Sequence, residues 1–297
     1  MVLSIAIAGA AATAIAMLAL YSADRLVAPP LAATDCIDEK LAFLREQKLE
    51  TIALMAVGSS ATWRNLDARE FAPVVAGPSL NAAPCYLYVH QTAACADMLL
   101  ARATAVETVV TFLHPRDFEA CSPADASVVD RELTLAFLDG RAPGWAIHAI
   151  NFRLDHIVRE AFEIRAQRDP SNGLTVANDA HGRSPMPQPY DFFPPPVFDE
   201  RCFAALSDLE TVVRASGARL VIASLPVMPE WARRYDPDGA IVSEWTTRIE
   251  ARLAPPTLFV DGARLSYSDD DFADAVHLTA EAGSRFSRYV ASQLASP

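Results

Sequence analysis

Ser60 and the motif Asp274-x-x-His277 have the residue types and the positions that nucleophilic catalysis requires. Ser60 follows an unbroken apolar run from Thr51 to Val57 that ends in Gly58, and Asp274 and His277 precede the last amphipathic stretch. In a serine relay, histidine takes the serine proton while an acid fixes the histidine tautomer and stabilises the imidazolium. A spacing of three residues lets the carboxylate face the imidazole. The sequence therefore predicts a catalytic triad.

A relay between residues so far apart requires strands that bring both motifs to one edge of a sheet. Four apolar runs, 51–57, 107–113, 218–225 and 257–260, are typical of strands buried on both faces, and a weaker strand is expected at 79–81. Helical patterns separate these runs, notably at 95–102, 146–167 and 203–216. The alternation predicts an α/β fold with three layers (α/β/α) and about five parallel strands in the flavodoxin-like order 2-1-3-4-5. Ser60 and His277 would then lie at the same edge.

Each motif taken alone has a structural alternative. Gly-Ser-Ser is a common turn, in which Ser60 would only cap a helix. An isolated Asp-x-x-His is more often structural than catalytic. Their positions after the first and last strands favour the catalytic interpretation.

With these motifs the chain resembles the SGNH hydrolases, also called GDSL-type esterases. Gly58-Ser59-Ser60 is similar to the family's first block, Gly-Asp-Ser, and Asp274 to His277 is similar to its last block. The resemblance covers roughly residues 50–294. It implies that Ser60 is the nucleophile, His277 the base and Asp274 its orienting acid. Membrane-anchored relatives linked to acetylation of surface polysaccharides often begin with a similar Gly-Ser-Ser.

The family's middle blocks donate hydrogen bonds to an oxyanion, and here they depart from the pattern. The second block corresponds to 81–83, so the backbone N–H of Ala83 would replace that of a glycine. The third, 114–118, contains no asparagine; Arg116 could substitute as a cationic donor or could pair with an acid such as Asp117. Losing one oxyanion donor costs about 3–4 kcal/mol of transition-state stabilisation. A catalytically impaired domain that binds glycan or scaffolds an envelope assembly is therefore the alternative function.

Two further residues are candidates for lining a substrate pocket. Trp63 could stack on a sugar ring or could simply pack under the first helix. His90 lies near the second block, and a partly buried histidine with satisfied hydrogen bonds is its alternative. The Pro-rich segment 169–198 predicts a long insertion, either a lid or a solvated loop.

The first 23 residues contain no charged side chain and, as a helix, would span roughly 34 Å, enough to cross a bilayer. Residues 1–33 are therefore expected to form a transmembrane anchor and linker, and 34–297 the SGNH-like domain. A buried core helix and a cleavable signal peptide are the alternatives, although the basic region that such a signal needs is missing. The expected location is the bacterial inner membrane, single-pass, with a periplasmic domain, but the flanking charges do not support this orientation.

Charge and cysteine content restrict cofactors and partners. Lys and Arg total 25 against 37 Asp and Glu, a formal charge of −12, which disfavours nucleic acid as a partner. The five cysteines have no CxxC spacing, so neither a metal site nor a cofactor is expected. In an exported domain Cys85 and Cys95 could pair, but an odd count fits small buried hydrophobes equally well.

These features together favour a serine esterase or O-acyltransferase that acts on an ester of a cell-envelope carbohydrate. Ser60 would form an acyl-enzyme, and water or a sugar hydroxyl would accept the acyl group. A membrane acyltransferase is a candidate partner, in keeping with the resemblance and the apolar N-terminal segment.

Overall fold

The computed structural model describes residues 9, 11, 12, 14–16, 28–153, 178–185 and 192–295. Within this part of the chain, one sheet is parallel throughout and has the strand order β2-β1-β3-β4-β5. This order and the α/β class confirm the predictions from the sequence. The strands are β1 (Leu54–Ala56), β2 (Ser79–Asn81), β3 (Thr108–Leu113), β4 (Arg219–Ser224) and β5 (Leu258–Asp261).

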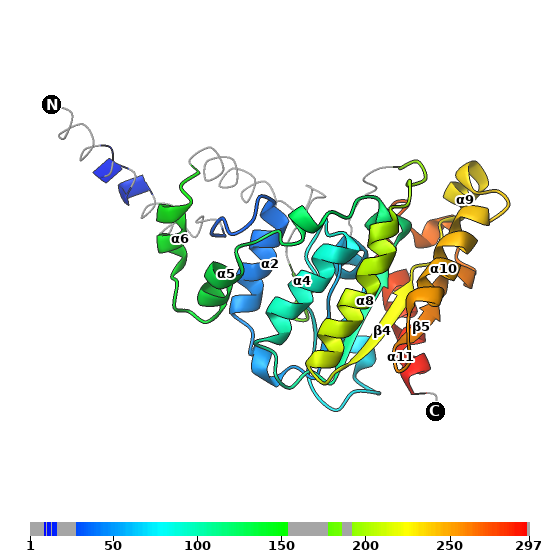
Figure 1. The fold of residues 1–297 in the computed structure, drawn as a ribbon, viewed down its shortest axis with the longest axis horizontal. Helices are drawn as coiled ribbons and strands as arrows, with labels where there is room; N and C mark the ends of the chain where they lie inside the picture. Colours follow the sequence, from blue (N-terminus) through cyan, green and yellow to red (C-terminus); the bar gives the residue numbers. More distant parts are fainter. Residues whose placement is uncertain are drawn as a thin grey trace.

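Helices cover both faces of this sheet, so the domain has three layers. Alternate residues of one strand face opposite layers: Met55 belongs to the core beneath α2, α4 and α8, whereas Leu54 and Ala56 belong to the core beneath α11. Figure 1 shows α2, α4 and α8 side by side. The helices are α2 (Asp35–Arg45), α3 (Ser60–Asn65), α4 (Val89–Leu100), α5 (Arg131–Leu138), α6 (Gly144–Ile150), α8 (Glu200–Ala215), α9 (Pro229–Tyr235), α10 (Ala240–Arg252) and α11 (Ala280–Leu294).

Helix α6 differs from its predicted extent. A continuous helix was expected over 146–167, but α6 begins at Gly144 and ends at Ile150, where the N–H of Asn151 donates to Ile147 O. The remainder, 154–167, lies outside the described residues. Apolar periodicity indicated that a helix was present but did not locate its end.

The folded domain begins earlier than residue 34. Leu31 and Ala32 are buried, and Asp38 Oδ1 accepts hydrogen bonds from the backbone N–H groups of both residues at 2.9 and 2.7 Å. Ala32 also forms an antiparallel bridge with Val129. The segment assigned to the linker is therefore part of the core. Most of the predicted anchor lies outside the described residues, and among the residues described no helix is long and apolar enough to cross a membrane.

A chain that starts at Thr34 is expected to be less stable than one that starts at Ala28, by about 3 kcal/mol, because it loses one buried leucine and two hydrogen bonds to a carboxylate. Urea unfolding of the two truncated proteins measures the difference. Equal free energies of unfolding would show that Leu31 and Ala32 contribute nothing to the domain.

The cysteine pairing also differs from expectation. Cys36 is bonded to Cys85 and Cys121 to Cys202, whereas Cys95 has a free thiol. The suggested Cys85 to Cys95 pair is therefore wrong. The pairs join segments 49 and 81 residues apart, and disulfides of this kind persist in oxidising compartments.

Candidate active site

Ser60, His277 and Asp274 form a continuous hydrogen-bonded chain. The Nε2 atom of His277 lies 3.1 Å from Ser60 Oγ. Its Nδ1 atom lies 2.8 Å from Asp274 Oδ2 and 3.0 Å from Oδ1. Both contacts are within the range that proton transfer needs. The structure thus places a base on the serine hydroxyl and an acid on the far side of the base.

The turn between β1 and α3 presents Ser60 at the carboxyl edge of the sheet. Gly58 has φ +151°, and a Cβ atom there would lie 2.0 Å from Thr62 Oγ1, so the close approach requires glycine. The Ser59 hydroxyl accepts the N–H of Ala61 at 3.1 Å and caps the helix. Ser60 is therefore the first helical residue, and its side chain is free to face His277.

The loop that carries the other two residues is held by its own backbone. Phe272 and Leu278 form an antiparallel bridge, and Asp274 Oδ1 accepts the N–H groups of Val276 and His277, each at 2.8 Å. Burial opposes ionisation of Asp274, but these bonds and the imidazole hold its pKa below the usual value. Asp274 therefore stays ionised and orients His277.

Asn65 links the serine helix to the histidine loop. Its Oδ1 accepts the N–H of Leu278 at 2.7 Å, while its Nδ2 donates to Ala61 O at 2.7 Å. Asn65 is completely buried, so this bridge is shielded from water. It connects the residue after His277 to the residue after Ser60.

A cavity of about 300 Å³ opens beside the triad. Its lining combines Ser60 and His277 with aromatic, cationic and acidic groups and the Cys36–Cys85 disulfide. The lining residues are Cys36, Ser59, Ser60, Trp63, Arg64, Cys85, Tyr86, Leu87, Tyr88, His114, Arg116, Asp117, Glu119, Phe193, Val276 and His277. Such a mixture of rings and hydrogen-bonding groups suits a polar ligand with flat apolar faces.

Arg116 lines this cavity, but its guanidinium is already engaged. It forms two hydrogen bonds with Glu119, at 2.9 and 3.2 Å, and lies 3.8 Å from the centre of the Phe193 ring. The acid that it pairs with is therefore Glu119 and not Asp117. To donate to an oxyanion, Arg116 would have to give up at least one of its hydrogen bonds to Glu119.

Trp63 borders the cavity, but its indole is packed inside the domain, in agreement with the packing alternative. It is 1% exposed, and its Nε1 donates to Asn178 Oδ1 at 2.8 Å. The guanidinium carbon of Arg64 lies 4.0 Å from the centre of the indole. Burial lowers the pKa of Arg64 to about 10, so this side chain remains a cation at neutral pH. Sequence reasoning missed Arg64 because arginine after a helix start carries no functional signal.

Ala83 and His90 do not line the cavity beside the triad. The N–H of Ala83 donates to Asn81 Oδ1 at 3.2 Å, and Ala83 is completely buried. His90 lines a separate cavity that includes Cys121 and Arg201. The N–H proposed to replace the family's glycine donor is thus engaged inside the domain.

A second polar pair beneath Ser60 was not predicted. The Ser59 hydroxyl donates to Asp117 Oδ1 at 2.6 Å, and Asp117 Oδ2 accepts the N–H of His114 at 2.8 Å. Burial raises the pKa of Asp117 to about 7, although the two hydrogen bonds act in the opposite direction and lower it. Burial also lowers the pKa of His114 to about 3, so its imidazole is neutral. The signal was present, since Ser59 stands where the SGNH hydrolases that the sequence resembles have aspartate, and Asp117 lies in the segment compared with their third block.

Asp117 is expected to make stability depend on pH. Its pKa is raised from 3.8 in the unfolded chain to about 7, so between these values the folded protein binds more protons and loses stability as pH rises. Asp117→Asn removes this effect. Between pH 5 and pH 8, the free energy of unfolding of the variant, relative to that of the natural protein, should rise by more than about 1 kcal/mol. Thermal unfolding measures both profiles, and parallel curves would contradict the assignment.

The middle of the Pro-rich insertion is docked against the elements that carry the candidate active site. His181 O accepts the N–H of Asn81 at 2.8 Å, Lys40 Nζ donates to Gly182 O at 2.5 Å, and Arg64 Nη1 donates to Ser184 O at 2.9 Å. Residues 178–185 therefore form neither a free loop nor a lid in this structure; the rest of 169–191 lies outside the described residues.

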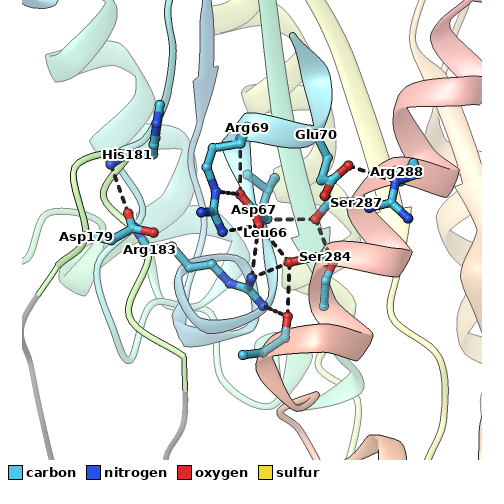
Figure 2. A network of polar contacts seen from close by, with 12 residues as sticks. Leu66, Asp67, Arg69, Glu70, Asp179, His181, Arg183, Ser284, Ser287 and Arg288 are labelled. Carbon is cyan, nitrogen blue, oxygen red and sulfur yellow. Dashed lines mark hydrogen bonds and ion pairs between the residues drawn. The ribbon is translucent and has the colours of Figure 1, made fainter. Parts of the chain in front are cut away.

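Arg183, at the centre of this docked segment, connects α3 to α11. Its Nε donates to Arg64 O at 3.1 Å, and its two terminal nitrogens donate to Ser284 Oγ at 2.9 Å and Ala280 O at 3.0 Å. Figure 2 shows the guanidinium between Ser284 and Asp67, whose carboxylate also binds Arg69. Arg183 thus joins the helix that begins with Ser60 to the helix that follows His277.

In the described ranges, no group of three or more histidine, cysteine or acidic side chains could hold a metal ion. A scan against protein-family models found no match for this chain, and a search of curated proteins also found none. Evidence for function therefore comes from the geometry of the site and from the sequence motifs.

Proposed function

We propose that this protein is an SGNH-type serine esterase or O-acyltransferase that acts on an acyl ester of a cell-envelope carbohydrate. The observation that carries the proposal is the hydrogen-bonded chain from Ser60 through His277 to Asp274, with separations of 3.1 and 2.8 Å. Ser60 and His277 line a cavity at the carboxyl edge of the parallel sheet, which is where open α/β folds bind ligands.

The reaction follows from these contacts. His277 Nε2 takes the proton of Ser60 as Oγ attacks the ester carbonyl, and Asp274 stabilises the imidazolium. Collapse of the tetrahedral intermediate breaks the ester bond, and the leaving alcohol takes the proton from His277. Water or a sugar hydroxyl then gives its proton to His277 and attacks the acyl-Ser60 carbonyl. Collapse of this second intermediate breaks the bond between the acyl group and Ser60 Oγ, and His277 returns the proton to the serine.

The oxyanion would be stabilised by the N–H of Ser60 together with a cationic side chain. Ser60 is the first residue of α3, so its N–H has no acceptor within the helix. Arg64 and Arg116 both line the cavity, and either could strengthen the site electrostatically.

The lining favours a sugar ester over an apolar ester. Tyr86, Tyr88 and Phe193 supply aromatic surface beside the polar groups, an arrangement that suits the apolar faces of sugar rings. The two disulfides fit an oxidising compartment, and the uncharged N-terminal segment suits a membrane anchor. These features support the proposed periplasmic location at the bacterial inner membrane, with a membrane acyltransferase as candidate partner.

A domain that only binds glycan is the second candidate, and one observation favours it. The N–H of Ala83 is engaged by Asn81, and the third block carries His114 and Arg116 in place of the family's asparagine. Two customary oxyanion donors are thus missing, which would slow acyl transfer while leaving the cavity intact.

Labelling with a fluorophosphonate distinguishes the two candidates, because the reagent reacts only with an activated serine. An enzyme should become labelled at Ser60, and Ser60→Ala should abolish the label. Ser207→Ala, an exposed serine on α8, is the matched control and should label normally. A folded protein that stays unlabelled would favour the binding function. For a labelled protein, acetyl release from nitrophenyl acetate with and without an oligosaccharide acceptor separates hydrolysis from transfer.

A further inference from the structure

Helix α6 and the two residues after it concentrate exposed apolar side chains at one end of the domain. Six large apolar side chains are exposed in the described part of the chain, and three of them, Trp145 (69%), Ile150 (69%) and Phe152 (48%), lie within eight residues. Ile147, on the inner side of the same helix, is completely buried in the core. The helix is therefore fixed to the domain while three large apolar groups face outward.

The sequence around α6 differs in charge from the rest of the chain. Residues 141–153 read RAPGWAIHAINFR and contain no acidic residue, although the chain has 37. Arg141 and Arg153 stand at the two ends of this stretch, and Arg141 pairs at 2.8 Å with Asp139, which lies just outside it. Apolar side chains with a tryptophan, flanked by arginines, are typical of segments that lie in the interfacial region of a bilayer that contains anionic lipid.

Both ends of α6 contact the point where the N-terminal segment joins the domain. Asn151 Nδ2 donates to Pro30 O at 3.0 Å. At the other end, Gly144 packs on Pro29. If this glycine had a Cβ atom, that atom would lie 3.7 Å from Pro29 Cγ. The uncharged run ends at residue 23, so at most about 20 Å of extended chain separates it from Pro29. If that run enters a membrane, α6 must lie close to the membrane surface.

We propose that the exposed surface formed by Trp145 and Ile150 of α6 and by Phe152, two residues beyond its end, inserts into the interfacial region of the membrane that holds the N-terminal segment. The domain would then have a second attachment to the bilayer, which fixes its orientation relative to the lipid surface. The proposal rests on membrane location of the N-terminal segment and is independent of ester chemistry, so failed labelling of Ser60 would leave it standing.

Trp145 is a built-in reporter for this contact. The other three tryptophans, Trp63, Trp231 and Trp245, are at most 5% exposed, so the difference spectrum between the natural protein and Trp145→Phe isolates its emission. The full chain is reconstituted in vesicles of phosphatidylglycerol and phosphatidylcholine whose acyl chains carry bromine. The Trp145 emission should be blue-shifted, should lose about half or more of its intensity to the brominated lipid, and should resist acrylamide, as interfacial tryptophan does.

Two variants keep the test specific. Ile150→Asp with Phe152→Asp places charge on an exposed surface, so folding is retained while the Trp145 emission should shift to the red and become accessible to acrylamide. Ala251→Trp in the Trp145→Phe background places a reporter at an exposed site on α10, which lies at the opposite end of the domain from α6 (Figure 1); brominated lipid should not quench it.

Trp145 emission characteristic of water, unaffected by brominated lipid in protein that floats with the vesicles, would overturn the proposal. Full-length protein that fails to float with the vesicles would overturn it as well, because the premise of membrane location would then be wrong. Equal quenching at positions 145 and 251 would also refute it, since it would show aggregation on the vesicle and no defined face.

Discussion

Alanine at Ser60 or at His277 is expected to reduce ester turnover by about 10⁴-fold or more, and the double variant should be no slower than either single one. The reason is that the 3.1 Å contact between Ser60 Oγ and His277 Nε2 makes the two groups one unit. Asp274→Asn should be milder or comparable, because it leaves the nucleophile and the base but removes the charge that stabilises imidazolium.

Single-turnover kinetics with nitrophenyl acetate, on variants whose unfolding curves match that of the natural protein, measure these effects. Ser207→Ala should retain full turnover. Additive losses in the Ser60 and His277 double variant would mean that the two residues act separately, and the relay would then be rejected.

Arg183→Met is expected to lower both stability and turnover, although Arg183 lies outside the triad. Its side chain is 2% exposed and faces Asp67, whose side chain is 1% exposed. The expected loss is about 1–3 kcal/mol, because buried acceptors lose a charged donor, although Asp67 keeps its bonds to Arg69 and Ser284. The substitution also breaks the contacts to Arg64 O and Ala280 O that join the two helices beside the triad. The rate constant kcat should therefore fall more than KM rises.

Arg69→Met provides the matched control for Arg183. Arg69 binds the same carboxylate at 2.7 Å, but its side chain is 58% exposed, so its loss should cost about 1 kcal/mol or less. Urea unfolding and steady-state kinetics on both variants test the comparison. Equal destabilisation by the two substitutions, or an unchanged kcat in Arg183→Met, would show that Arg183 does not position the catalytic helices.

The parallel sheet and the triad pairing could be predicted because each depends on a pattern confined to a short segment. The apolar runs at β1, β3, β4 and β5 indicated buried strands, and strand order follows from the rules that govern parallel connections. Ser60 begins the helix that follows β1, and His277 lies in the loop that leads into α11. A parallel sheet gathers such positions at one edge, so their meeting required no knowledge of side-chain packing.

The middle blocks show where local patterns stop being informative. The sequence suggested Ala83 as an oxyanion donor, but its N–H is taken by the carbonyl of Asn81, whose amide also holds Leu66 O at 2.9 Å. Likewise, Arg116 had two acids nearby in sequence, and only the folded loop selects Glu119. A hydrogen bond depends on separations of a few tenths of an ångström, which residue spacing does not specify.

The sequence by itself determined the α/β class, the strand order and the residues able to form a relay, because periodicity of apolar residues decides which segments become buried strands and helices. Only the tertiary structure decided that Cys36 pairs with Cys85 and that Arg183 bridges α3 and α11. It also decided that α6 meets the chain at Pro30. These contacts join segments far apart in the chain. The position of each side chain depends on the packing of all the elements around it, which a local sequence pattern does not specify.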